Sequence, residues 1–286
     1  MIAAGIVLLA SVALGCFALV RLAARDGQAF LIATPLLFGL LLLWCWEVIC
    51  VGFGVPRVLL PAPTGIAQAF VAHLPMLWAD FVQTVIRAVL PGYAIGCAAG
   101  YLTAIALDRS AFLRRGVLPI AGLLGAMPIV GIAPIMVMWF GFDWPSKAAV
   151  AAVMTFFPML VNTVAGLSGT GVMERDLMQS YGASYWQTLV KLRLPAALPF
   201  VFNALKLNFT LALIGAIVAE FFGTPIVGMG FRISTEAARL DLDVVWAEIA
   251  LAAITGSACF ALLALLERTV LFWHPSFQKL ALSKRR

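Results

Sequence analysis

Residues 174–195 read ERDLMQSYGASYWQTLVKLRLP and form the longest polar passage of a chain that is otherwise a series of apolar segments. A first short helix is expected over Met173–Tyr181. Gly182 follows it, and glycine is the residue that best tolerates the left-handed conformation after a helix end. A second helix is expected to start at Ser184, because Ser184 and Gln187 have the spacing of a capping box. The passage therefore predicts a polar helical hairpin between two apolar segments.

The end of this hairpin is expected at a proline. Lys191 and Arg193 fall in the last turn of the second helix, where positive charge suits the helix dipole. Leu194-Pro195 is expected to end that helix. Pro195 and Pro199 then bracket the first turn of the next apolar helix.

The composition indicates a membrane protein. Of the 286 residues, 63% are hydrophobic and only 11% are charged, whereas about a quarter of the residues of a soluble domain are charged. Apolar runs of about 20 residues recur, which is the length that crosses a bilayer as a helix. The expected fold class is an all-α polytopic membrane protein. The net charge of +6 is better explained by where the basic residues fall along the chain than by a nucleic-acid partner, and no such partner is expected.

Seven spans are expected, at about residues 2–20, 30–51, 82–107, 117–140, 148–167, 196–222 and 244–273. Pro128 and Pro134 are expected to interrupt the fourth. Gly92, Gly96 and Gly100 recur at every fourth position of the third, a stripe that lets two helix backbones pack closely. The five cysteines lie in apolar spans without a CxxC pair, so no metal site is expected.

The basic residues predict the orientation. With residues 173–195 placed inside, most of the 19 Lys and Arg residues fall in cytoplasmic segments, which places the N-terminus outside and the C-terminus in the cytoplasm. Tryptophans gather at the predicted outer boundary, as interfacial tryptophans do. They are Trp44, Trp46, Trp78, Trp139, Trp144 and Trp246.

The polar hairpin is similar to the EAA loop of bacterial ABC-importer permeases. The match is Gly182, nine residues, Leu192, one residue, then Leu194-Pro195; Asp176-Leu177-Met178 stands where Glu-Ala-Ala is usual. Weaker matches extend the resemblance over about residues 30–273, most closely to the permeases for nitrate, sulfonates and taurine. They are Leu59–Pro63, Thr84–Arg87, Trp139–Gly141, Phe156–Thr163, Val218–Glu220 and Leu266–Arg268.

The resemblance implies a type I importer transmembrane domain, with six core helices plus one extra N-terminal helix, in the bacterial inner membrane. It implies an ABC ATPase subunit, a periplasmic or lipid-anchored substrate-binding protein, a second permease copy in a homodimer, and membrane lipids as partners. ATP and Mg²⁺ would bind the ATPase, since this chain has no phosphate-binding loop. The residues expected to couple to the ATPase are Asp176, Gly182, Ala183, Tyr185, Trp186, Leu194 and Pro195.

Three parts of the chain are expected. Residues 1–28 would be an added transmembrane helix with a cytoplasmic link, residues 29–273 the importer domain with its coupling loop at 173–195, and residues 274–286 a basic cytoplasmic tail. A translocation path is expected near broken helices and polar groups in the spans. Its candidate residues are Met127, Pro128, Asn162, Thr163, Asn208, Thr210 and Glu220. For Met127, Asn162, Thr163, Asn208 and Thr210, simple interhelical hydrogen bonding explains the residue at least as well. Glu220 is expected either to help shape an outer gate or only to cap the outer boundary of its helix.

Other function classes stay open at this point. An intramembrane enzyme is disfavoured, because the two histidines, His73 and His274, fall near opposite boundaries and neither HExxH nor Gly-x-Ser-x-Gly occurs. An ion-coupled carrier without an ATPase could use Glu47, Lys206 and Glu220 as relay groups. For an importer, the substrate is expected to be a small anion of the sulfonate, taurine or nitrate class, with a pyrimidine or flavin vitamin precursor as the alternative.

Overall fold

A computed structural model describes residues 2–23, 28–223 and 226–273, and all regular elements among them are helical. The link at residues 24–27 and the basic tail 274–286 lie outside the described residues. The helices are α1 (Ile2–Ala23), α2 (Gln28–Gly52), α3 (Pro63–Ala72), α4 (Leu74–Phe81), α5 (Leu90–Asp108), α6 (Ala111–Gly125), α7 (Ile129–Phe140), α8 (Trp144–Ser168), α9 (Val172–Ser180), α10 (Tyr185–Thr188), α11 (Leu194–Glu220), α12 (Met229–Ala238) and α13 (Leu242–Val270). Two π-helical segments, η1 (Val82–Val89) and η2 (Leu189–Arg193), join α4 to α5 and α10 to α11.

Five helical segments in the described part are long and apolar enough to cross a membrane. They are Ala33–Gly52, Leu74–Asp108, Trp144–Ser168, Tyr185–Glu220 and Leu242–Val270. They coincide with the second, third, fifth, sixth and seventh expected spans, and the first expected span is the helix α1. The all-α polytopic fold class is therefore confirmed.

The fourth expected span is two helices, and only one of its two prolines interrupts it. α6 ends at Gly125 and α7 begins at Ile129, with Pro128 at the N-cap in an extended conformation (φ −67°, ψ 127°). Pro134 lies inside α7 without ending it, so the interruption expected there is wrong. At 15 and 12 residues, each helix is shorter than the about 20 residues that span a bilayer.

The expected helix end at Leu194-Pro195 is also wrong. Residues Tyr185–Glu220 form one continuous helical segment. The π-helical turn η2 precedes the proline, and the Leu194 N–H donates to the carbonyl of Leu189. The same arrangement occurs at Leu90-Pro91, after η1. The wider turn takes in an extra residue, which lets the helix pass a proline that cannot donate its own hydrogen bond.

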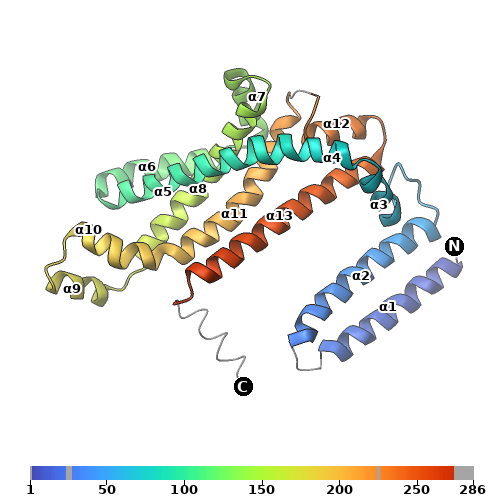
Figure 1. Cartoon of the computed structure of the whole chain (residues 1–286), viewed down its shortest axis with the longest axis horizontal. Coiled ribbons are helices and arrows are strands. Elements are labelled where there is room, and N and C mark those ends of the chain that lie inside the picture. The colour runs from blue at the N-terminus through green and yellow to red at the C-terminus, as the bar shows by residue number, and fades with distance from the viewer. Residues whose placement is uncertain (1, 24–27, 224–225, 274–286) are drawn as a thin grey trace. The chain divides into compact units, whose positions relative to one another are not determined.

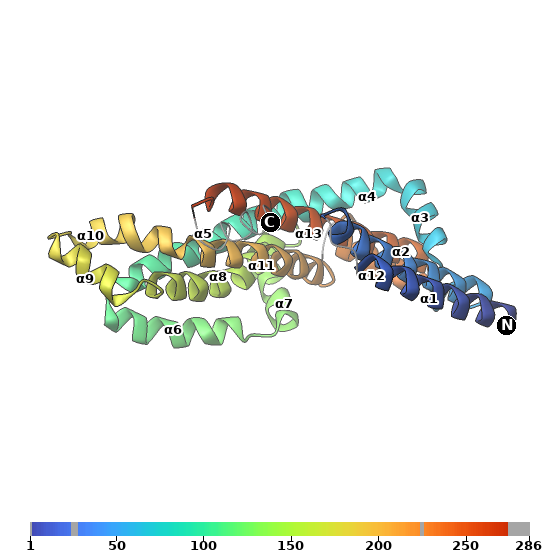
Figure 2. The same ribbon diagram turned by 90° about the horizontal axis from the view of Figure 1, so that it is seen from below.

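One compact unit runs from Trp78 to Phe231 and continues from Leu251. Its centre is α8, with α5 and α11 lying alongside it in both views (Figures 1 and 2). The expected glycine stripe makes the α5–α8 contact possible. A Cβ on Gly92, Gly96 or Gly100 would lie 2.4, 2.3 or 2.5 Å from a backbone carbonyl oxygen of α8. The packing role predicted for these glycines is confirmed.

The other compact unit comprises the chain up to Leu77 together with Arg232–Ala250. Within it α1 and α2 pack as an antiparallel pair (Figure 1). The Trp46 and Trp246 rings meet edge to face at 5.0 Å, and Glu47 accepts hydrogen bonds from the Thr64 hydroxyl and N–H. Only 6% of the most apolar window of α2 is buried, so most of its surface is left for lipid or another chain.

Candidate coupling site

The hairpin at residues 172–193 follows the local signals in its sequence. α9 starts after Gly171, whose N–H donates to the Glu174 carboxylate at 3.1 Å. At its end the Ala183 N–H donates to the Met178 carbonyl (3.0 Å), and the Gly182 N–H donates to that of Gln179 (2.9 Å). This pair of bonds is a Schellman motif, which needs a left-handed residue at the position of Gly182. Its φ is +67°, so the predicted glycine turn is confirmed.

The predicted start of the second helix is also confirmed. The Ser184 N–H donates to Oε1 of Gln187 at 2.8 Å, and the Gln187 N–H donates to Oγ of Ser184 at 3.3 Å. The two residues form a reciprocal capping box. Because the helix then continues through η2 into α11, the turn at Gly182 is joined directly to a long membrane helix.

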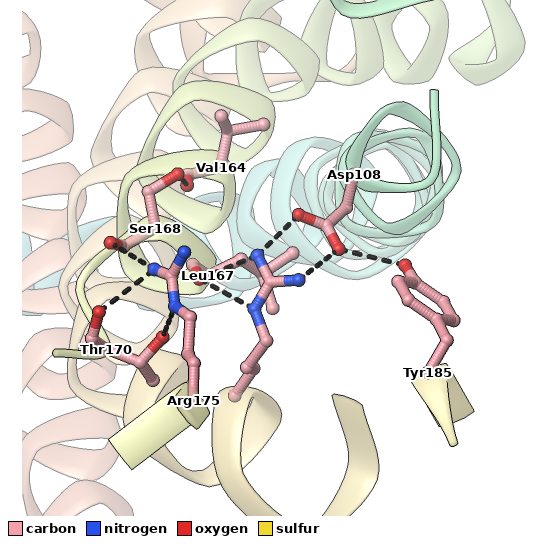
Figure 3. Close-up of polar contacts among 8 residues, drawn as sticks. Asp108, Val164, Leu167, Ser168, Thr170, Arg175 and Tyr185 are labelled. Atoms are coloured by element: carbon pink, nitrogen blue, oxygen red, sulfur yellow. Dashed lines mark hydrogen bonds and ion pairs between the residues drawn. The ribbon is translucent and has the colours of Figure 1, made fainter. Parts of the chain in front are cut away.

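A partly buried ion pair fastens this hairpin to the end of α5. Nη2 and Nη1 of Arg193 donate to Oδ1 and Oδ2 of Asp108, both at 2.6 Å, and the Tyr185 hydroxyl donates to Oδ2 at 2.8 Å (Figure 3). The side chains of Arg193 and Asp108 are only 14% and 9% exposed. A bidentate arginine–carboxylate pair is among the stronger and more directional contacts in proteins.

Two arginines of the hairpin also cap the end of α8. Arg193 donates through Nε and Nη2 to the Leu167 carbonyl, at 3.1 and 2.9 Å. Arg175 donates through Nη2 to the carbonyls of Ser168 and Thr170, each at 2.9 Å, and through Nε to the Thr170 hydroxyl (Figure 3). Carbonyls at a helix C-terminus have no partner within the helix, so these arginines satisfy them. The hairpin is thus bonded to both α5 and α8.

The far side of α9 is not covered by any residue in the part of the chain that the structure describes. None of its residues is buried. Met173, Leu177 and Tyr181 follow one another at four-residue spacing, so they share one face. Their exposed fractions are 85%, 56% and 80%. The hairpin therefore has a bonded side, which faces the membrane helices, and an open side with apolar side chains.

A second polar cluster lies at the opposite end of α11, around Glu220, which is 2% exposed. Its Oε1 accepts from the Thr84 hydroxyl at 2.7 Å, and its Oε2 accepts from the Gly230 N–H at 2.6 Å. The Thr84 hydroxyl in turn accepts from the Met229 N–H (2.9 Å), and Asp80 Oδ1 accepts from the Gly228 N–H (2.6 Å). The segment at residues 228–230 is thereby bonded to α4, η1 and α11.

Residues 92–271, more than half of the chain, match the family described as "Binding-protein-dependent transport system inner membrane component". The chain belongs to this family. The permease is 31% identical to the formylaminopyrimidine transport permease ThiX of Halalkalibacterium halodurans, over 84% of this chain and 95% of the relative. It is 30% identical to the riboflavin transport permease RibX of Chloroflexus aurantiacus, over 83% of this chain and 88% of the relative. It is 29% identical to the aliphatic sulfonates transport permease SsuC of Bacillus subtilis, over 82% of this chain and 84% of the relative.

These matches confirm the resemblance to ABC-importer permeases. The permease is a multi-pass membrane component of a transport system rather than an enzyme, so the intramembrane-enzyme alternative is set aside. The family description also implies that it works with a substrate-binding protein. The relatives bear names from both substrate classes that the sequence left open.

The structure divides the expected coupling residues of the permease between two environments. Asp176, Gly182 and Trp186 are exposed on the hairpin. Tyr185 turns inward to Asp108, and Ala183 is half-buried. Leu194 and Pro195 are also half-buried, and they belong to the first turn of α11.

The expected path residues do not form a single cluster. Asn208 is fully buried, and its Nδ2 donates to the Thr155 carbonyl and the Cys97 sulfur, so it joins α11 to α8 and α5. Asn162 bonds within its own helix, to the Pro158 carbonyl. The buried Thr163 hydroxyl has no partner among the described residues. Met127, Pro128 and Thr210 are exposed, and Glu220 lies in the cluster at the end of α11.

Sequence reasoning missed Asp108 and Arg175, and it gave Arg193 only a role in the helix dipole. Asp108 comes at the end of an apolar span and before a basic loop, so nothing nearby marked it as special. The available signal was a lone carboxylate at the boundary of one span and an arginine at the boundary of another. Such charges tend to pair when they are partly buried.

Proposed function

We propose that the permease is the transmembrane subunit of an ATP-driven importer, and that a separate ATPase subunit drives it through residues 172–195. The observation that carries this proposal is the open face of α9, where Met173, Leu177 and Tyr181 are exposed. An apolar face on a short helix between two membrane helices suits a protein partner. Asp176, Gly182, Ala183 and Trp186 would position that face.

The bonded side of the hairpin gives a physical route for coupling. Arg193 joins the hairpin to Asp108 of α5 and to the C-terminus of α8, and η2 continues into α11. Leu194 and Pro195 lie in the first turn of α11, within this continuous helix. A displacement of α9 would therefore be passed to three packed helices at once, because none of these connections is a flexible loop.

The proposed cycle is alternating access. Two permease copies would each seat a hairpin on an ATPase subunit that binds ATP and Mg²⁺. A substrate-binding protein would deliver the solute from outside, closure of the ATPases on ATP would open the pair outward, and hydrolysis would reset it. The hairpin would lie in the cytoplasm, with the N-terminus outside, the C-terminus inside, and the chain in the bacterial inner membrane.

Glu220 is proposed to shape the outer gate. It holds Thr84 and Gly230 together at the end of α11 that lies away from the hairpin. The proposed contributors to the translocation path are Asn162, Thr163, Asn208 and Thr210, with Met127 and Pro128 at the α6–α7 break. We also propose that the chain has three parts: an added helix at residues 1–28, a transport domain at 29–273 and a tail at 274–286.

Two substrate classes are proposed. The first is a small anion of the sulfonate, taurine or nitrate class, supported by relatives named for sulfonates and taurine. Arg87 could contribute a positive charge, since it lines a hollow of about 560 Å³ in the larger unit, together with the carboxylate of Asp143. The second is an aromatic vitamin precursor, supported by the pyrimidine and riboflavin relatives. Trp78 lines the same hollow and stacks on Phe81 at 5.3 Å.

The test is uptake into proteoliposomes that contain the permease, its ATPase subunit and its substrate-binding protein. Uptake is expected only when ATP, Mg²⁺ and the ATPase are all present. Transport by the permease alone, driven by an ion gradient, would instead support the lone-carrier alternative. Calorimetry with the binding protein then separates the substrates, with taurine and nitrate as one set of probes and riboflavin and formylaminopyrimidine as the other.

A further inference from the structure

A groove of about 560 Å³ lies beside the coupling hairpin, between the end of α5, the start of α6 and α10. One wall is apolar and includes Leu102 and Leu113, which are 63% and 41% exposed. The other wall holds Arg109, Tyr185 and Trp186. The groove therefore places a cation and two aromatic rings beside apolar side chains that continue along a membrane helix.

Arg109 keeps its charge available to a ligand in this groove. Its guanidinium carbon lies 5.8 Å from the centre of the Tyr185 ring and 5.6 Å from that of the Trp186 ring. Among the residues that the structure describes, no carboxylate pairs with it. Its neighbour Asp108 is already occupied by Arg193 and Tyr185. The cation is thus held in place by aromatic rings, which leave its N–H donors for an anion.

The chemistry of the two walls favours one kind of ligand. A free anion would use Arg109 but would leave the apolar wall uncovered, and a purely apolar ligand would leave the cation without a partner. A phospholipid with an anionic headgroup satisfies both walls. Trp186, 53% exposed, is a residue type that gathers at the headgroup level, and basic side chains near a membrane surface attract acidic lipids.

We propose that this groove binds an anionic phospholipid, with the phosphate at Arg109 and the first part of an acyl chain over Leu102 and Leu113. The lipid would touch α5, α6 and α10 together, and would therefore brace the hairpin against the membrane helices. Its placement in the cytoplasmic leaflet rests on the orientation proposed above. Binding itself does not depend on that orientation or on the ATPase.

The test is native mass spectrometry of the purified full-length permease, titrated with phosphatidylglycerol or with phosphatidylcholine. The wild-type chain is expected to retain phosphatidylglycerol preferentially. Arg109→Gln is expected to bind it roughly fivefold more weakly, the effect of one cation near a membrane surface. The matched control is Arg57→Gln, which removes an exposed arginine in the other compact unit and should leave binding unchanged.

Further variants keep the outcome decisive. Arg109→Lys retains the charge and is expected to keep most of the binding, so a loss in Arg109→Gln alone cannot be ascribed to misfolding. Equal retention of the two lipids by the wild-type chain would overturn the proposal. So would an Arg109→Gln variant that binds phosphatidylglycerol normally; if that variant also failed to support stimulated ATP hydrolysis, Arg109 would belong to ATPase docking instead.

Discussion

Arg193 and Asp108 are 85 residues apart in the sequence and are joined by two hydrogen bonds of 2.6 Å. Arg193 lies in the π-helical turn before α11, and Asp108 is the last residue of α5. The same arginine caps the carbonyl of Leu167 near the end of α8. One side chain thus ties together the ends of the three helices at the centre of the larger unit.

Asp108→Asn is expected to destabilise the permease by about 2 kcal/mol, because the charge of Arg193 would remain mostly buried without its partner. It is also expected to uncouple ATP hydrolysis from uptake. The matched control is Arg239→Gln, because the Arg239 side chain is 71% exposed and its partner Glu236 keeps a second arginine, Arg232, at 3.8 Å. An exposed pair of this kind contributes about 0–1 kcal/mol. Thermal unfolding in detergent measures the loss of stability, and ATP-driven uptake compared with ATP hydrolysis measures the loss of coupling. Equal effects from the two variants would show that burial of the Asp108 pair does not matter.

Gly182→Val is expected to reduce coupled uptake at least tenfold while the protein still inserts into the membrane. No atom lies within 4 Å of an added Cβ, so the effect comes from the backbone, whose φ of +67° a β-branched residue adopts only at a cost. Gly54→Val is the matched control, because Gly54 has a φ of +66° and equally open surroundings, and lies outside the hairpin. Normal uptake by Gly182→Val, measured at equal protein levels, would remove the hairpin from the coupling mechanism.

Gly96→Ala is expected to destabilise the helix bundle by about 1–3 kcal/mol. The added Cβ would lie 2.0 Å from Oγ1 of Thr155 and 2.3 Å from the Ala152 carbonyl oxygen. The threonine can rotate, but the backbone of α8 must move. Gly116→Ala, in α6 with nothing within 4 Å, is expected to be neutral or stabilising by up to about 1 kcal/mol. The unfolding midpoint should therefore fall in Gly96→Ala and stay unchanged or rise in Gly116→Ala.

Local chemistry made some features of this chain predictable. Gly182, the Ser184–Gln187 capping box and the break at Pro128 each depend on residues within one or two turns of each other. The spacing of Gly92, Gly96 and Gly100 marks one helix face, which is sufficient to predict a close contact although not its partner.

Features that depend on tertiary contacts were not predictable in the same way. Pro195 was expected to end a helix, because the cost of an internal proline is clear from sequence while the π-helical turn that accommodates it is not. The partner of Arg193 could not be identified, since periodicity gives no information about which helix ends meet. A break at Pro128 was expected within one span, yet it separates two helices of 15 and 12 residues, because apolar composition alone does not show whether a helix continues beyond a break.

Glu220→Gln is expected to weaken the polar cluster at the end of α11 that lies away from the hairpin. The carboxylate accepts from the Thr84 hydroxyl on one oxygen and from the Gly230 N–H on the other. A glutamine has only one acceptor oxygen, so its NH₂ group would face one of these two donors. The site has no room to adjust, since even a Cβ on Gly228 would lie 2.8 Å from the carboxyl group of Glu220. The segment at residues 228–230 should therefore loosen.

Stimulation of ATP hydrolysis by the loaded binding protein is the measurement that checks this effect, because in the proposed cycle that signal passes from the outer face of the permease to the ATPase. We expect at least a fivefold loss in Glu220→Gln, while basal hydrolysis changes little. Glu47→Gln is the matched control, since Glu47 also accepts from a threonine hydroxyl and a backbone N–H, those of Thr64, at a more exposed position. Unchanged stimulation in Glu220→Gln would mean that the cluster holds the fold together but takes no part in the gate.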